Sequence, residues 1–170
     1  MEASNLVLCK ALQQLKNEHV ELRTDMDRFY DLAEEIEYES GPIVVQLFAT
    51  LYDQVLAFTE RLKKHSHKED NGLFPLMKLH LEDNDRTIEE MEEEHEKAEG
   101  HLNSFLTEAM EGGLDLKEDD IQTMTVYVQQ AYATLTQHFA KEEKVLFPLA
   151  ENILSSQEKE ELMTLWGQEQ

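Results

Sequence analysis

Two copies of one motif constrain what this chain can fold into. Residues 65–75 read His-x3-Glu-Asp-x2-Leu-Phe-Pro, and residues 138–148 read His-x3-Glu-Glu-x2-Leu-Phe-Pro. Side chains four residues apart lie on the same face of an α-helix. Each copy therefore directs an imidazole and a carboxylate toward the same point. Nitrogen and oxygen ligands that converge from one helix suit a first-row transition metal.

Apolar residues recur at alternating spacings of three and four along most of the chain, which is the pattern of amphipathic helices. The four stretches cover about residues 4–38, 44–76, 88–109 and 121–149. A shorter pattern follows at about 156–167, and no segment alternates as a strand does. We therefore predict a single all-α domain over 1–170. Its core, about 4–150, is an antiparallel up-down-up-down four-helix bundle, followed by a short C-terminal helix.

Individual residues predict where these helices begin and end. Pro75 predicts a kink in the second helix, or its end near residue 74. Gly112-Gly113 predicts a left-handed cap after the third helix. Asp115 is the expected N-cap of the fourth helix, and Ser155-x-x-Glu158 is expected to start the terminal one.

Polar residues interrupt the apolar stripe of every long helix. They are His19, His65, Glu69, His95, His138 and Glu142. Each half of the chain supplies one histidine followed by one His-x3-Glu, so a pseudo-two-fold axis would bring all six to one level of the bundle. A single histidine on an apolar stripe is usually a satisfied core residue. Two buried carboxylates with four imidazoles need a compensating charge, however. Hydrogen bonds between the histidines and the glutamates supply part of it, and metal ions supply it better.

The ligand types indicate which metal would bind. The only cysteine, Cys9, lies off the stripe, which argues against a sulfur-ligated zinc site. Calcium and magnesium prefer all-oxygen shells, whereas four imidazoles and two carboxylates suit iron, with manganese or zinc as alternatives. One octahedral ion could use all six residues, but two ions fit the internal symmetry better. With an oxide or hydroxide bridge, about two positions stay open for a diatomic ligand, and Glu99, four residues after His95, could fill one of them.

The chain resembles the hemerythrin-like family, often called the HHE cation-binding domain. The resemblance rests on Glu18-His19, Glu94-His95 and the two His-x3-Glu copies that end in Leu-Phe-Pro. It implies a four-helix bundle with a non-heme di-iron centre. By position, the two glutamates would bridge, and the terminal ligands would be His19, His65, His95 and His138.

One residue departs from the family pattern. The oxygen-carrying hemerythrins of marine worms place two histidines four residues apart on the third helix, and here the second of that pair is Glu99. A more anionic set of ligands favours ferric iron and faster autoxidation. The departure therefore argues against stable oxygen carriage and toward sensing, iron handling or redox chemistry.

Three functions follow from these residues. The leading hypothesis is a non-heme di-iron binding protein, not an enzyme, that binds oxygen, nitric oxide or iron for sensing, scavenging or storage. The second is a nitrosative or oxidative stress protein that supports iron–sulfur cluster repair. The third is a metal-free helical interaction module, in which hydrogen bonds alone satisfy the polar residues.

The overall charge narrows the classes of partner. A formal net charge of −22 repels phosphate backbones and anionic lipids, so we expect no nucleic-acid or membrane partner. The segment Met1–Ser4 has no basic stretch, and no long apolar run follows it. With a single cysteine, the chain fits a reducing, cytoplasmic setting. The helical periodicity does not orient His80, and the sequence does not indicate an oligomeric state.

Overall fold

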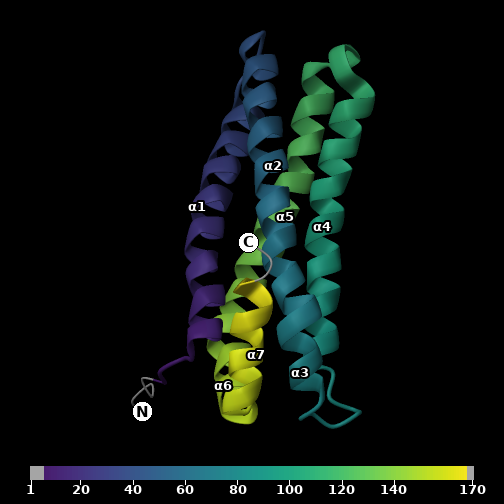
Figure 1. Cartoon of the computed structure of the whole chain (residues 1–170). Helices are drawn as coiled ribbons and strands as arrows, with labels where there is room; N and C mark the ends of the chain where they lie inside the picture. The colour runs from purple at the N-terminus through teal and green to yellow at the C-terminus, as the bar shows by residue number, and fades with distance from the viewer. Residues whose placement is uncertain (1–5, 168–170) are drawn as a thin grey trace, which may run out of the picture.

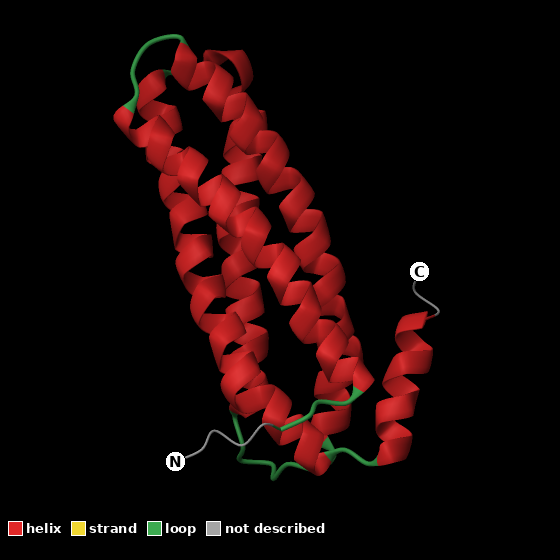
Figure 2. Cartoon of the chain, turned by 90° about the vertical axis from the view of Figure 1, so that its left-hand side faces the viewer, coloured by secondary structure: helices red, strands yellow, loops and turns green. Residues whose placement is uncertain are grey.

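The computed structural model describes residues 6–167, and they form helices joined by short turns (Figure 1). The four long helices are α1 (Lys10–Tyr38), α2 (Ile43–Lys68), α4 (Thr87–Gly112) and α5 (Glu118–Lys141). Successive long helices run in opposite directions along one elongated bundle, and no strand occurs among the described residues (Figures 1 and 2). The predicted all-α class, with a short C-terminal helix, α7 (Ser156–Gly167), is confirmed.

A polar layer divides the core of the bundle into two apolar clusters. On α1, Leu15 belongs to one cluster and Leu22 to the other, and His19 lies between them. The same change from one cluster to the other occurs between Leu62, on α2, and Leu73, in the turn that follows α2. The predicted site therefore lies in the polar layer between two apolar clusters.

Each motif copy contains one widened turn. The segments are η1 (Glu69–Leu73), a π-helical turn followed by α3 (Phe74–Lys78), and η3 (Glu142–Leu146), a π-helical turn followed by α6 (Phe147–Ile153). A proline lacks an N–H group, and its ring clashes with the carbonyl four residues earlier in a regular α-helix. A π turn just before Pro75 and Pro148 relieves this clash. The chain therefore stays helical through Pro75, where a kink or an end was predicted, and each π turn begins at a motif glutamate.

The first helix begins later than predicted. Residues 1–5 lie outside the described part of the chain, and residues 6–9 are not helical. α1 starts at Lys10, where the backbone N–H of Cys9 donates to Glu151 Oε2 at 2.9 Å. A carboxylate from a distant part of the chain thus takes the place of a local cap, which the local sequence does not reveal.

The other helix ends give two corrections and one confirmation. Asp115 is not an N-cap, because it lies in a 3-10 turn and α5 begins after Lys117, whose N–H donates to Asp120 Oδ2. Gly113 ends α4 at the predicted place with a positive φ of 50°, but its ψ of −128° is not that of the predicted left-handed cap. The start of α7 at Ser155 is confirmed, and there Ser155 and Glu158 exchange backbone-to-side-chain hydrogen bonds of 2.9 and 3.1 Å.

Helix α7 packs against one end of the bundle, beside α1 and η1 (Figure 1). Its buried residues are Leu162 and Trp166, and the Trp166 indole lies close over Gly72 in η1. His80, which the periodicity left unplaced, lies after α3 within 2.8 Å of Glu158. Within residues 6–167 no helix is both long and apolar enough for a bilayer crossing.

Candidate metal centre

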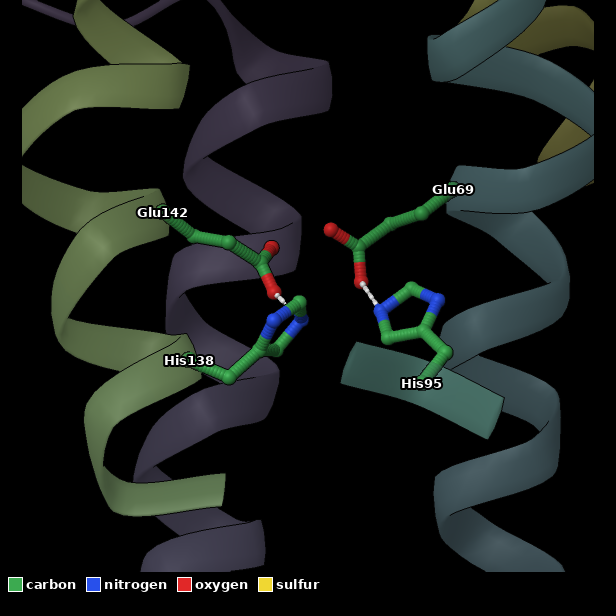
Figure 3. Close-up of side chains that lie close together, drawn as sticks. All are labelled: Glu69, His95, His138 and Glu142. Carbon is green, nitrogen blue, oxygen red and sulfur yellow. Dashed lines mark ion pairs between the residues drawn. The ribbon is translucent and has the colours of Figure 1, made fainter. Parts of the chain in front are cut away.

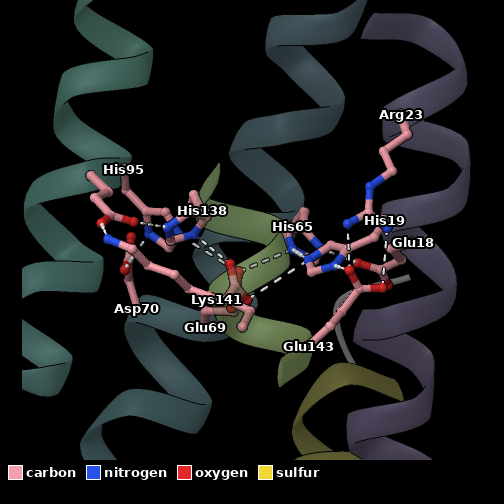
Figure 4. Close-up of polar contacts among 12 residues, drawn as sticks. Glu18, His19, Arg23, His65, Glu69, Asp70, His95, His138, Lys141 and Glu143 are labelled. Carbon is pink, nitrogen blue, oxygen red and sulfur yellow. Dashed lines mark hydrogen bonds and ion pairs between the residues drawn. The ribbon is translucent and has the colours of Figure 1, made fainter. Parts of the chain in front are cut away.

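All six predicted polar side chains lie together inside the bundle (Figure 4). The most exposed of them, His95, keeps only 4% of its surface accessible, and Glu69 and Glu142 keep none. One histidine comes from each long helix, because the helical period places His19, His65, His95 and His138 on the inward-facing stripes. The fold therefore gathers four imidazoles and two carboxyl groups in one dry layer.

The imidazoles form two pairs. His19 Nε2 lies 3.2 Å from His65 Nε2, which joins α1 to α2. The rings of His95 and His138 have centroids 4.5 Å apart, which joins α4 to α5. Each half of the chain thus contributes one pair, as the internal repeat predicted.

The two carboxylates lie between these pairs. Glu69 Oε1 is 3.0 Å from His65 Nε2 and 3.6 Å from His95 Nε2. Glu142 is 3.7 Å from His19 Nε2 and also touches His138 Nε2 (Figure 3). Each carboxylate therefore contacts one imidazole of each pair, which is the position of a bridging ligand between two ions.

Two overlapping groups of side chains have the spacing of a metal site. Glu69, His95, His138 and Glu142 form one group, and His19, His65 and Glu142 form the other. Within each group the ligand atoms lie within 4.8 Å of one another, and Glu142 belongs to both. Two adjacent ions that share Glu142 would use both groups at once.

The polar atoms at the centre lack hydrogen-bond partners. Both carboxylate oxygens of Glu69 and of Glu142 are buried without a hydrogen bond, as is Nε2 of His95 and of His138. Their close approaches to one another do not have hydrogen-bond geometry. A buried polar atom left without a partner destabilises the fold. Bound cations would satisfy these atoms, so the donor set fits a pair of metal ions.

Two outer glutamates fix the orientation of the motif histidines. Nδ1–H of His65 donates to Glu18 Oε1 at 2.8 Å, and Nδ1–H of His138 donates to Glu94 Oε2 at 2.7 Å (Figure 4). Lys68 holds Glu18 in turn, with Nζ at 2.6 Å. A carboxylate on Nδ1 leaves Nε2 free for the centre and strengthens it as a ligand.

These supporting residues were not assigned a role from the sequence. Glu18-His19 and Glu94-His95 marked the family resemblance, but the partner of each glutamate is the histidine of the next helix. Lys141 binds Glu94 as Lys68 binds Glu18, and each lysine follows its motif histidine by three residues. The sequence did contain a signal for them. In each half, a glutamate stands directly before the first histidine, and a lysine stands three residues after the second histidine.

The remaining two histidines have unlike partners. Nδ1–H of His95 donates to Asp70 Oδ1 at 2.9 Å. His19 Nδ1 lies 3.9 Å from Glu143, which Arg23 binds through both carboxylate oxygens. The two halves of the centre are therefore similar in their ligands and different in their surroundings.

Burial and charge shift the ionisation of these groups in opposite directions. Burial disfavours a charged imidazole, but the nearby carboxylates of Glu69 and Glu18 outweigh it and raise the pKa of His65 to about 10. Burial, together with the charge on His65, lowers the pKa of His19 to about 2. Burial and repulsion from Glu69 raise the pKa of Glu142. Two carboxylates this close cannot both ionise easily without a bound cation.

Glu99 lies outside both groups. Its side chain is half-buried on α4, and its predicted role as an additional ligand stays a prediction. Cys9 lies at the start of α1, below the site in the bundle, and takes no part in either group.

Comparison with protein families identifies the domain. The sequence profile of the hemerythrin HHE cation binding domain matches residues 10–150, which run from the start of α1 into α6. The chain belongs to this family. The HHE assignment predicted from the motifs is thus confirmed over most of the chain. Comparison with curated proteins gives no match.

Proposed function

We propose that this HHE domain is a non-heme di-iron protein that binds a diatomic gas, oxygen or nitric oxide, for sensing or scavenging, or stores iron itself. The observation that carries the proposal is the pair of buried carboxylates, Glu69 and Glu142, each placed between two imidazole pairs and each without a hydrogen bond. This arrangement supports two ions with shared ligands.

The donor set favours iron. Four imidazoles and two carboxylates, with no thiolate in either group, suit iron better than calcium, magnesium or a structural zinc. Bound iron would supply redox chemistry and free positions for a small ligand, and an oxide or hydroxide would complete the bridge. The chain itself supplies the dry layer and the outer carboxylates of Glu18 and Glu94, which hold the imidazoles in place.

The metal-free alternative accounts for part of the network only. Hydrogen bonds satisfy Nδ1 of His65, His95 and His138. The four oxygens of Glu69 and Glu142 stay unbonded in the same structure. A module held together only by hydrogen bonds would leave these atoms at a cost of about 1–3 kcal/mol each.

Metal analysis of the purified chain tests this proposal. The protein is loaded anaerobically with ferrous iron, desalted and assayed for iron per chain, and its near-ultraviolet spectrum is recorded before and after nitric oxide or oxygen is added. We expect about two irons per chain and a spectral change with at least one gas. Glu69→Ala should lose the iron, and Glu93→Ala, whose carboxylate is exposed on α4, serves as the matched control.

The outcomes separate the alternatives. Equal iron in the wild type and Glu69→Ala would contradict a metal centre at this layer. Two irons with no response to either gas would leave iron storage as the function.

A further inference from the structure

The two halves of the centre repeat closely in their packing as well as in their ligands. Phe147 stacks on His19 with ring centroids 5.6 Å apart, and Phe74 stacks on His95 at 5.7 Å. The hydrogen bonds from the motif histidines to the outer glutamates measure 2.8 and 2.7 Å. Because these distances repeat, a residue in one half predicts the place of its counterpart in the other.

One pair of counterparts breaks this repeat. Phe139 follows the motif histidine of α5 and stacks on His19, with centroids 4.1 Å apart, so His19 has a phenylalanine ring on two sides. The counterpart of Phe139 is Ser66, which follows the motif histidine of α2. Among the described residues, His95 stacks on one phenylalanine only, Phe74. The pseudo-two-fold therefore places a hydroxyl beside His95 where a ring covers His19.

The Ser66 hydroxyl has no partner. Its side chain is 2% exposed, and its Oγ makes no hydrogen bond. Buried hydroxyls in helices usually donate to a backbone carbonyl one turn earlier, as Thr59 does to Val55 at 2.8 Å. An unbonded hydroxyl next to the predicted ligands is therefore available to a bound molecule.

A second pair of counterparts differs in charge. Arg23, four residues after His19, lies 5.8 Å from the centroid of Phe139 and binds Glu143, which closes that side. Its counterpart four residues after His95 is Glu99, a half-buried carboxylate. One side of the centre is covered by a ring and a guanidinium, and the residues at the corresponding positions of the other half carry a hydroxyl and a carboxylate.

We propose that a small neutral ligand, of the nitric oxide or dioxygen class, binds on the His95 side of the centre, where the small side chain of Ser66 stands at the position that the Phe139 ring takes in the other half. The Ser66 hydroxyl donates a hydrogen bond to it. Glu99 disfavours anions there by charge repulsion, so ligands such as azide bind more weakly. This inference rests on the proposed di-iron function, because the ligand needs the metal of the His95 and His138 pair.

Substitutions of Ser66 test the assignment. The iron-loaded chain is titrated with nitric oxide, and iron per chain and the Mössbauer spectrum of the two irons are recorded for each variant. Ser66→Phe should keep two irons per chain and lower the affinity for nitric oxide by about tenfold or more. In its Mössbauer spectrum, nitric oxide should no longer make the two irons differ from each other. Ser66→Ala keeps a small side chain and loses the hydroxyl, so the affinity should fall by about twofold to tenfold. Thr59→Ala is the matched control, because it removes a buried hydroxyl of the same helix that already donates to Val55, and it should leave the affinity unchanged.

Each result bears on a different claim. Wild-type affinity in Ser66→Phe, or an equal loss of affinity in Thr59→Ala and Ser66→Ala, overturns the assignment to the Ser66 side. Should Ser66→Phe fail to take up iron, Ser66→Ala decides, and an unchanged affinity overturns the role of the hydroxyl. An iron-loaded wild type that binds no nitric oxide contradicts the gas-binding function itself. Glu99→Gln should in addition tighten azide binding. An unchanged azide affinity in this variant would show that the Glu99 carboxylate does not act on the ligand.

Discussion

Replacing Glu142 by leucine should affect the metal-free and the metal-loaded protein in opposite directions. In the metal-free protein, Glu142 has no accessible surface, its pKa is raised by burial and by Glu69, and neither of its oxygens is hydrogen-bonded. Leucine has a similar volume and removes these unsatisfied atoms. The free energy of unfolding of the metal-free protein should therefore rise by about 1–3 kcal/mol.

The metal-loaded protein should show the reverse. Glu142 is the one residue that both ligand groups share, so its loss weakens both positions. A ligand that binds only the folded state stabilises it by about 2.7 kcal/mol at a hundredfold excess over its Kd. The wild type should gain about this amount from ferrous iron, and the variant should gain almost nothing and hold fewer than two irons.

Urea unfolding followed by far-ultraviolet circular dichroism, with and without ferrous iron, measures both effects. Leu135→Met, a volume-conserving change on the same stripe of α5, serves as the control and should respond to iron as the wild type does. A metal-free Glu142→Leu protein that loses about 3–5 kcal/mol would refute the reasoning. Such a loss is typical of breaking a satisfied buried ion pair, and it would mean that Glu142 stabilises the fold without a cation.

Four further substitutions test the surroundings of the centre and the packing of the helices. Glu18→Gln should leave the fold intact and weaken iron affinity by about tenfold to a hundredfold in an equilibrium titration, because Nδ1 of its histidine partner loses its carboxylate. Gly72→Ala should lower the free energy of unfolding, measured in urea, by about 1–3 kcal/mol, since the added Cβ would lie 3.0 Å from the buried Trp166 indole. Gly100→Ala, with open space around the added Cβ, should raise the free energy of unfolding by about 0.5–1 kcal/mol. Glu151→Gln should destabilise the protein by about 0.5–1 kcal/mol at neutral pH and by progressively less as the pH falls below 4.5. Although burial opposes it, hydrogen bonds from Cys9 and Lys159 hold the pKa of this carboxyl below 4.5, so its stabilisation is present above that pH and is lost as the pH falls through the lowered pKa. Equal destabilisation at neutral and at acidic pH would exclude the charge as the cause.

Local signals predicted most of the architecture correctly. Helical periodicity located the long helices, and Gly113 and the Ser155–Glu158 pair predicted helix ends because their effects act within one turn of the backbone. One prediction failed where the deciding contact comes from a distant segment. The start of α1 depends on Glu151, which lies 142 residues away in the sequence, and no local pattern reveals it.

The widened turns lie between these cases. Pro75 marks the position of a disturbance, but the backbone can respond by kinking, ending or widening. Leu73 and Phe74 are buried in the apolar cluster that also contains Leu15. A π turn lets the helix continue past Pro75 and keeps both side chains in that cluster. The sequence locates the disturbance, and the packing decides its form.

By itself, the sequence determined that the chain forms amphipathic helices and that His19, His65, Glu69, His95, His138 and Glu142 lie on their inward stripes, since helical period is a local property of the backbone. The tertiary structure decided how the helices stagger past one another. That stagger brings the six side chains to one level and pairs Glu18 with His65 across two helices. Stagger depends on side chains packing between helices, so a pattern read along one helix cannot contain it.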